Sequence, residues 1–130
     1  MPKYMFLLYA EQPDEAEIQR RDSEVPLWIE LNRSLEEAGV LVAGDRLAPV
    51  DVATTLRVRD GETEIVDGPF ATTKEILGGY YLLDCNDLDE ALKWAARTPI
   101  ARFGSVEVRP VVENPLDPAS RQAAAEQQAG

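Results

Sequence analysis

VDGPFATTKEILGGYYLLD, residues 66–84, runs from a tight turn into a buried strand. Turn chemistry dominates its start: the Asp67 carboxylate can accept backbone N–H bonds, Gly68 can adopt a conformation closed to other residues, and Pro69 fixes the bend. Its end, residues 78–84, is rich in tyrosine and leucine on both alternating faces, which is typical of a strand covered on both sides. The segment therefore predicts a turn followed by a central strand.

The same turn also supports a functional interpretation. It would aim Asp67 and Phe70 into a cavity, with Lys74 and Glu75 close behind. A carboxylate and an ammonium in a partly buried pocket shift each other's pKa and can act as base and charge stabiliser. Asp67, Lys74 and Glu75 are the catalytic candidates on this interpretation. The alternative is a purely structural turn, with Lys74 and Glu75 as an ordinary surface pair.

Other strands are predicted on both sides of this segment. Residues 54–59 and 62–67 alternate in polarity around Asp60-Gly61, which is among the stronger short signals of a β-hairpin. Residues 3–10 carry aromatic and aliphatic side chains on both faces, as expected of a central strand. Two more strands are predicted at residues 40–44 and 105–112.

Two amphipathic helices are predicted between these strands. The first starts at Pro26, ends at Gly39 and has an apolar stripe of Leu27, Leu31, Leu35 and Ala38. The second starts at a capping box, Asp87 to Glu90, and ends before Pro99, with a stripe of Leu88, Ala91, Leu92 and Ala95. The polar segment 11–24 lies between prolines and holds at most a short helix.

The order strand, helix, strand, inserted hairpin, strand, helix, strand is that of a split βαβ fold of the α+β class. Two helices cover only one face of the sheet, yet the strands are apolar on both. The free face therefore predicts a homodimer with two sheets face to face, enclosing a cavity in each subunit. Residues 1–112 form the predicted domain, and residues 113–130, poor in bulky apolar side chains, are predicted to be a mobile tail.

Composition excludes several functions. The 130 residues carry a net charge of -11 with scattered lysines and arginines, which disfavours nucleic acid binding. The chain has no histidine, so neither a Ser-His-Asp nor a Cys-His catalytic centre can form. Carboxylates are dispersed and Cys85 is the one cysteine, so no metal site is predicted. No phosphate-binding or dinucleotide-binding loop is present, and no cofactor is expected.

Cys85 lies in an apolar run and is predicted to be a buried packing residue that needs no oxidising compartment. The apolar start of the chain is too short for a secretion signal, and no stretch approaches the roughly 20 apolar residues that span a membrane. We therefore expect a cytoplasmic protein with no membrane partner.

Residues 66–84 resemble the YCII-related family, in particular the subgroup named for its Asp-Gly-Pro-Phe sequence. Further matches extend the resemblance over residues 3 to about 112, at 3–5, 39–44, 87–92 and 104–110. The resemblance implies a ferredoxin-like fold that assembles as a dimeric α/β barrel. This agrees with the fold inferred from the order of elements.

The resemblance implies less about function. Relatives resemble small enzymes with a His-Asp pair at the cavity, but the histidine position falls near Trp28 here and the aspartate position near Glu37. That pair is therefore absent, and its mechanism cannot be transferred. Members of the Asp-Gly-Pro-Phe subgroup are often encoded beside sigma factors of the extracytoplasmic-function type, which implies a regulatory role as an alternative.

Several side chains are candidates for ligand binding. Arg46, after a strand, and Arg102, before the last one, can hold an anion by bidentate hydrogen bonds, with solvent-facing or structural ion pairs as the alternative. Trp28 and Tyr80 either pack or line a pocket. Glu107 and Arg109 share one face of the last strand, where a cross-strand ion pair is expected. The predicted ligand site does not include this pair; it consists of Trp28, Arg46, Asp67, Phe70, Lys74, Tyr80 and Arg102.

Two functions follow as hypotheses. The first is a cavity at the dimer interface that binds a small polar or anionic molecule, with at most weak or non-standard catalysis. The second is a non-enzymatic accessory or regulatory protein, linked to a sigma-factor system and meeting a basic partner. The sequence assigns no substrate and leaves open whether the chain is an enzyme.

Overall fold

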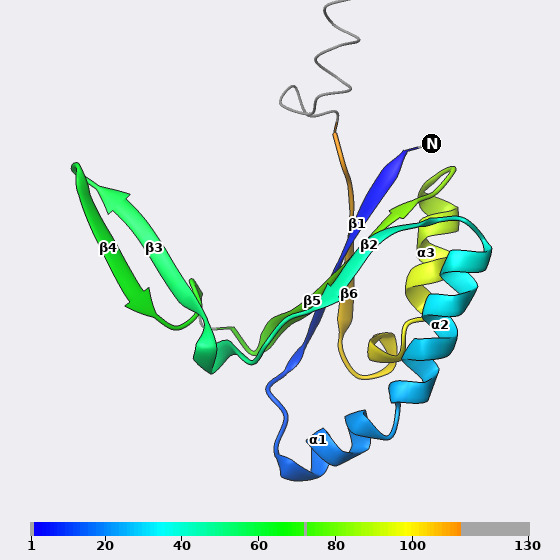
Figure 1. The fold of residues 1–130 in the computed structure, drawn as a ribbon, viewed down its shortest axis with the longest axis horizontal. Coiled ribbons are helices and arrows are strands. Elements are labelled where there is room, and N and C mark those ends of the chain that lie inside the picture. Colours follow the sequence, from blue (N-terminus) through cyan, green and yellow to red (C-terminus); the bar gives the residue numbers. More distant parts are fainter. Residues whose placement is uncertain (1, 72, 113–130) are drawn as a thin grey trace, which may run out of the picture.

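The structure is a computed structural model that describes residues 2–71 and 73–112. Its strands and helices follow the chain in the order shown in Figure 1: β1 (Lys3–Glu11), α1 (Glu15–Asp22), α2 (Val25–Glu37), β2 (Leu41–Arg46), η1 (Val50–Val52), β3 (Thr54–Arg59), β4 (Glu62–Asp67), β5 (Glu75–Asp84), α3 (Leu88–Ala96), η2 (Pro99–Arg102) and β6 (Ser105–Pro110). The predicted tail at 113–130 lies outside the described residues.

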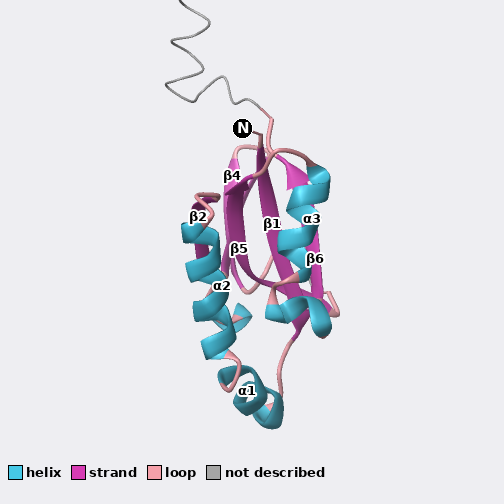
Figure 2. Cartoon of the chain, turned by 90° about the vertical axis from the view of Figure 1, so that its right-hand side faces the viewer, coloured by secondary structure: helices cyan, strands magenta, loops and turns pink. Residues whose placement is uncertain are grey.

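Four strands form one antiparallel sheet in the order β2-β5-β1-β6. Helices α2 and α3 both cover the same face of this sheet (Figure 2). This is the arrangement predicted for a split βαβ chain, and it is compatible with a ferredoxin-like fold. β1 and β5 are the two central strands, as their apolar sequences indicate.

The core lies between the sheet and the two helices. Alternate residues of β1 are buried there, and Phe6 is only 1% exposed. The buried cluster combines side chains of both strands and both helices, including Leu31, Leu35, Leu83 and Ala91. Cys85 is fully buried against this cluster, as predicted.

Helix packing departs from the predicted stripes at a few positions. Leu27, Leu88 and Leu92 are each about half exposed, and Ala38 is the exposed C-cap of α2. Small side chains explain this for α3, because Ala91 and Ala95 let the helix lie close to the sheet and leave the leucines on its flanks. The predicted cap is present: the Asp87 carboxylate accepts from the Glu90 N–H at 2.9 Å.

Strands β3 and β4 form a separate two-stranded hairpin. Asp60 and Gly61 at its tip have φ of 53° and 79°, the positive values that the predicted Asp-Gly turn requires. The hairpin projects on the side of the large sheet opposite to α2 and α3 (Figure 1). Short connections at its base hold it: the Gly68 N–H donates to the Ala53 carbonyl, and the Thr55 hydroxyl to the Gly68 carbonyl.

Candidate functional site

No helix of the described residues covers the face of the four-stranded sheet that is turned away from α2 and α3 (Figure 1). We call it the open face. Strand register places on it the odd-numbered residues of β1 and their partners, among them Met5, Leu7, Tyr9, Ala43, Asp45, Tyr80, Leu82, Glu107 and Arg109. The apolar members at its centre, in β1 and β5, are only partly buried. The open face is therefore an apolar surface with polar groups toward both edges.

Tyr80 and Asp45 form a polar pair on the open face. Their strands are in register at these two residues, and the Tyr80 hydroxyl donates to the Asp45 carboxylate at 3.0 Å. This hydrogen bond, together with the charge of Asp45 and burial, raises the pKa of Tyr80. The phenol therefore stays protonated near neutral pH. It can serve as a hydrogen-bonding group but not as a general base, because a general base would have to be deprotonated.

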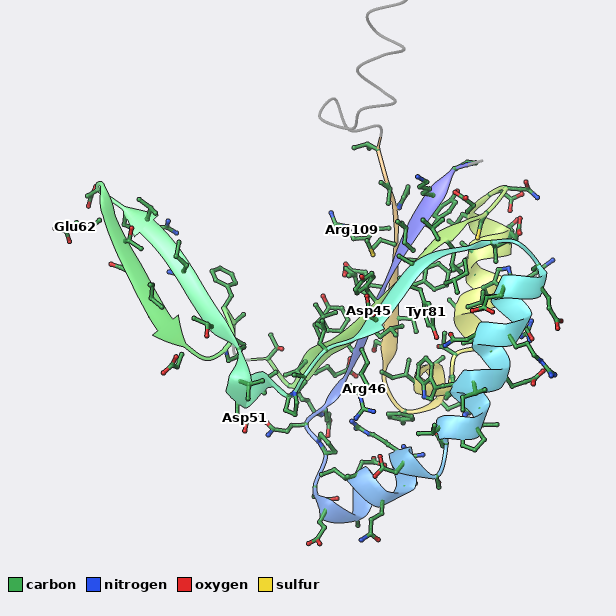
Figure 3. The ribbon with its side chains drawn as sticks, in the orientation of Figure 1. Asp45, Arg46, Asp51, Glu62, Tyr81 and Arg109 are labelled. Atoms are coloured by element: carbon green, nitrogen blue, oxygen red, sulfur yellow. The ribbon has the colours of Figure 1, made fainter. Side chains whose placement is uncertain are left out.

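Glu107 and Arg109 lie at the other edge of the open face. Their cross-strand neighbours in β1 are Leu7 and Met5, and β6 is an edge strand. The predicted cross-strand ion pair is therefore wrong for the described part of the chain. Figure 3 shows Arg109 on the side of the sheet away from the helices, where its guanidinium is available to an anion.

The Asp67–Phe70 turn lies at the base of the hairpin. Gly68 has φ of 112°, which confirms the conformational reason for glycine there. Within residues 2–71 and 73–112, the Asp67 carboxylate accepts no hydrogen bond, so the structure does not show its predicted capping of the turn. Phe70 is 71% exposed, and the Arg57 guanidinium lies 4.8 Å from the centre of its ring. The turn thus holds an exposed aromatic ring beside the Asp67 carboxylate.

Lys74 and Glu75 lie where the chain enters β5. The Lys74 ammonium is 3.3 Å from the Glu11 carboxylate, and both side chains are largely exposed. Glu75 is directly opposite Glu11 in the sheet. Lys74 thus contacts a carboxylate, but of β1, which differs from the predicted Lys74-Glu75 pair.

Three predicted ligand residues lie on the opposite, helix-bearing side of the sheet: Arg46, Trp28 and Arg102. Arg46 follows Asp45 in β2, so its side chain points to the other face, away from Tyr80. Trp28 of α2 is half-buried and stacks on Tyr81, with ring centres 6.3 Å apart. Tyr81 donates to the Asn32 side chain of the same helix. Trp28 therefore packs between helix and sheet.

Arg102 pairs with Glu24 at 2.8 Å, and Glu24 also accepts from Arg20 at 2.9 Å. The Glu24 side chain is only 13% exposed, so this carboxylate links α1 to η2. Arg102 also lines a shallow hollow of about 220 Å³ between α2 and η2, together with Leu27, Glu30, Leu31, Ala96, Arg97, Thr98 and Pro99. The structural alternative for Arg102, an ion pair, is thus the one observed.

The model of the YCII-related domain matches residues 3–115. The chain belongs to the YCII-related family. An uncharacterized protein of Rhizobium meliloti (strain 1021) is 51% identical over 83 residues, which cover 62% of this chain and 67% of that protein. Its name states no activity, so this relative assigns no substrate to the YCII-related chain.

The predicted site residues of this YCII-related protein do not converge within one copy. In the described residues, Lys74, Tyr80 and Arg102 each interact with a residue outside the predicted set. No group of three potential metal ligands is found in that part of the chain, and none of its helices is long and apolar enough to cross a membrane. On the open face, Asp45 and Tyr80 form one hydrogen-bonded pair, whereas Arg109 lies in the opposite edge strand.

Sequence reasoning missed Asp45 as a site residue. Its partner Tyr80 is 35 positions away, and only the β2-β5 register brings the two together. Local sequence offered one usable signal, an acidic residue directly before Arg46 at the end of a strand. A bulge between Leu41 and Ala43 then decides which face each of these residues takes.

Two buried groups predict how stability depends on alkaline pH. Burial raises the pKa of Tyr81 to about 12, from 10.0. Burial, followed by the charges of Glu90, Asp84 and Asp87, raises the pKa of the Cys85 thiol to about 11, from 9.0. The unfolded chain therefore loses these protons at lower pH than the native chain, and stability present below pH 9 is lost as the pH rises toward 12.

We expect Tyr81→Phe to flatten the upper part of this alkaline transition. At high pH, deprotonation of Tyr81 should lower the free energy of unfolding of the wild type by about 2 kcal/mol, and the variant should not show this loss. Urea unfolding at a series of pH values from neutral to 12 measures this. An equally steep decline in the variant would show that Tyr81 does not contribute. Cys85 provides an independent check, since its thiol should react with a disulfide reagent only after unfolding.

Proposed function

We propose that this YCII-related protein, of the Asp-Gly-Pro-Phe subgroup, is a cytoplasmic homodimer that binds a small polar or anionic molecule between two open faces. One observation carries the proposal: the open face joins an apolar floor to a hydroxyl-carboxylate pair, Tyr80 and Asp45, and to an arginine, Arg109. Ligand sites in proteins typically combine apolar walls with a few placed polar groups.

Dimerisation would supply what one copy lacks. The apolar centre of the open face is partly exposed in a single chain, and surfaces of this kind mark interaction sites. A twofold axis brings the same surface of each copy together, so Glu107 of one copy can pair with Arg109 of the other. The two charges, whose cross-strand neighbours among the described residues are Leu7 and Met5, support this arrangement.

Each polar group would have a separate role in the bound state. Arg109 provides the positive charge for a carboxylate or phosphate, and its planar guanidinium favours bidentate binding. The Tyr80 hydroxyl, held by Asp45, orients a second polar atom of the ligand. In the dimer, Asp67 and Phe70 would lie at the rim of the cavity. Without histidine, and with Tyr80 protonated, proton transfer would be weak, so binding is the principal activity we propose.

Ligand binding can be tested by thermal stabilisation. A screen of small carboxylates and phosphates should contain compounds that raise the melting temperature, because a ligand at 100 times its Kd stabilises the native state by about 2.7 kcal/mol. Arg109→Gln and Tyr80→Phe should abolish the shift. Arg33→Gln is the control, since Arg33 forms exposed pairs on α2. Equal shifts in all three variants would place the ligand elsewhere.

The oligomeric state gives the second test. Light scattering after size exclusion at micromolar concentration should yield twice the chain mass of 14.4 kDa. A monomer would contradict the proposed cavity. A monomer that no compound stabilises, but that captures a basic partner protein, would favour the regulatory role instead.

A further inference from the structure

Within residues 2–71 and 73–112, the hairpin β3–β4 has no packing partner. Every residue of both strands is exposed except Thr55, and among the described strands β3 and β4 pair only with each other. An isolated two-stranded hairpin is marginally stable in water. The hairpin therefore needs a surface that the described part of one copy does not provide.

The register of the hairpin separates its side chains into two different faces. Leu56 lies opposite Ile65, and Val58 opposite Thr63, so these apolar side chains share one face. They are 55–66% exposed. The other face carries Arg57 opposite Glu64 and Arg59 opposite Glu62. One face is therefore suited to water and the other to burial, as in a strand pair that covers a core.

We infer that the hairpin is an arm that packs its apolar face, Leu56, Val58 and Ile65, on the open face of the partner subunit. This inference rests on the homodimer proposed above. It adds that each subunit contributes its hairpin to the ligand site of the other. The hairpin and the open face lie on the same side of the chain, away from α2 and α3 (Figure 1). A partner that approaches the open face therefore also meets the hairpin.

Interface size favours a second copy as the occupant. A specific interface takes roughly 20–30 residues from each partner. The open face offers only the outward side chains of four short strands, which is fewer. Two arms exchanged across a twofold axis enlarge the buried area without a new partner. Because each chain has a net charge of -11, apolar area is what association requires.

Charge complementarity supports the same occupant. Asp67 is the one ionisable side chain that the register places with Leu56 and Ile65 on the apolar face of the hairpin. The open face has two cations, Lys3 and Arg109, in one corner, where Asp84 lies opposite Lys3 and Glu107 is two residues from Arg109. Lys3 and Arg109 are the cations with which the Asp67 carboxylate of an arm can pair on this face. The arm would then bring Asp67 to the partner's ligand site.

Two neighbouring residues of β4 provide a matched test. Ile65 and Val66 are 66% and 60% exposed in one copy, but they lie on opposite faces of the hairpin. Ile65→Lys should raise the Kd of the dimer on the order of 100-fold, because the apolar contact is lost twice in a symmetric dimer. Val66→Lys should change it less than about threefold. Sedimentation at a series of concentrations measures both.

A photo-crosslinking amino acid at position 65 identifies the occupant. In a mixture of isotope-labelled and unlabelled full-length chains, we expect crosslinks between chains, from position 65 to peptides of β1 or β5. Crosslinks within one chain, or from hairpin to hairpin, would overturn the inference. So would a dimeric wild type in which the Ile65 and Val66 variants behave alike, and that result would leave the dimer itself intact. A monomeric wild type would instead refute the proposed dimer.

Discussion

Replacing Gly104 by alanine is expected to lower the free energy of unfolding by about 3 kcal/mol. A methyl group on Gly104 would lie 2.2 Å from the backbone carbonyl oxygen of Tyr9 and 3.0 Å from the Ile100 side chain. A backbone oxygen in a central strand cannot move aside as a flexible side chain can. The sheet and the η2 segment would have to separate at the end of β1, where the core closes.

Gly78→Ala is the matched control for this prediction. The nearest atom to a methyl group at Gly78 is the Leu8 carbonyl oxygen at 3.9 Å, an ordinary contact distance. Both substitutions reduce the entropy of the unfolded chain equally, so their difference isolates the clash. Thermal unfolding should show a melting temperature on the order of 15 °C lower for Gly104→Ala than for Gly78→Ala. Similar melting temperatures would mean that β1 and η2 are not packed this closely.

Local chemistry explains why the fold was largely predictable from the sequence. Asp60-Gly61 specifies its turn through positive φ at both residues, and Asp87 specifies the start of α3 by capping. Alternation in β1 separates buried from partly exposed residues along the whole strand. Each of these signals acts within a few residues of the chain, so the order of elements, and with it the sheet, follows from them.

Predicting the site was harder, because its contacts depend on register and on distant pairs. A bulge in β2 places Arg46 on the helix-bearing face and Asp45 on the open face, the opposite of what a ligand site containing Arg46 and Tyr80 requires. Arg102 meets Glu24, which is 78 positions away. A register shift of one residue exchanges the two faces of a strand, and the local sequence pattern does not reveal such a shift.

The largest expected effect on association comes from a substitution at the centre of the proposed dimer interface. Leu7 lies at the centre of the open face, between Glu107 of β6 and Tyr80 of β5. In the proposed dimer, Leu7→Lys would place two ammonium groups in an apolar interface and remove two leucine side chains. The loss of burial alone amounts to about 3–6 kcal/mol for the two sites, so the Kd should rise on the order of 1000-fold. Sedimentation should find a monomer at micromolar concentration.

Ile29→Lys is the control for Leu7→Lys. Ile29 is 63% exposed on α2, on the other side of the sheet, and the same change of residue there should leave the dimer intact. Circular dichroism should show that both variants keep the native fold, since Leu7 is not part of the buried core. Ligand stabilisation should disappear with the dimer in Leu7→Lys, because the proposed cavity needs two open faces. A monomeric Leu7 variant that still binds the ligand would show that one open face is a complete site.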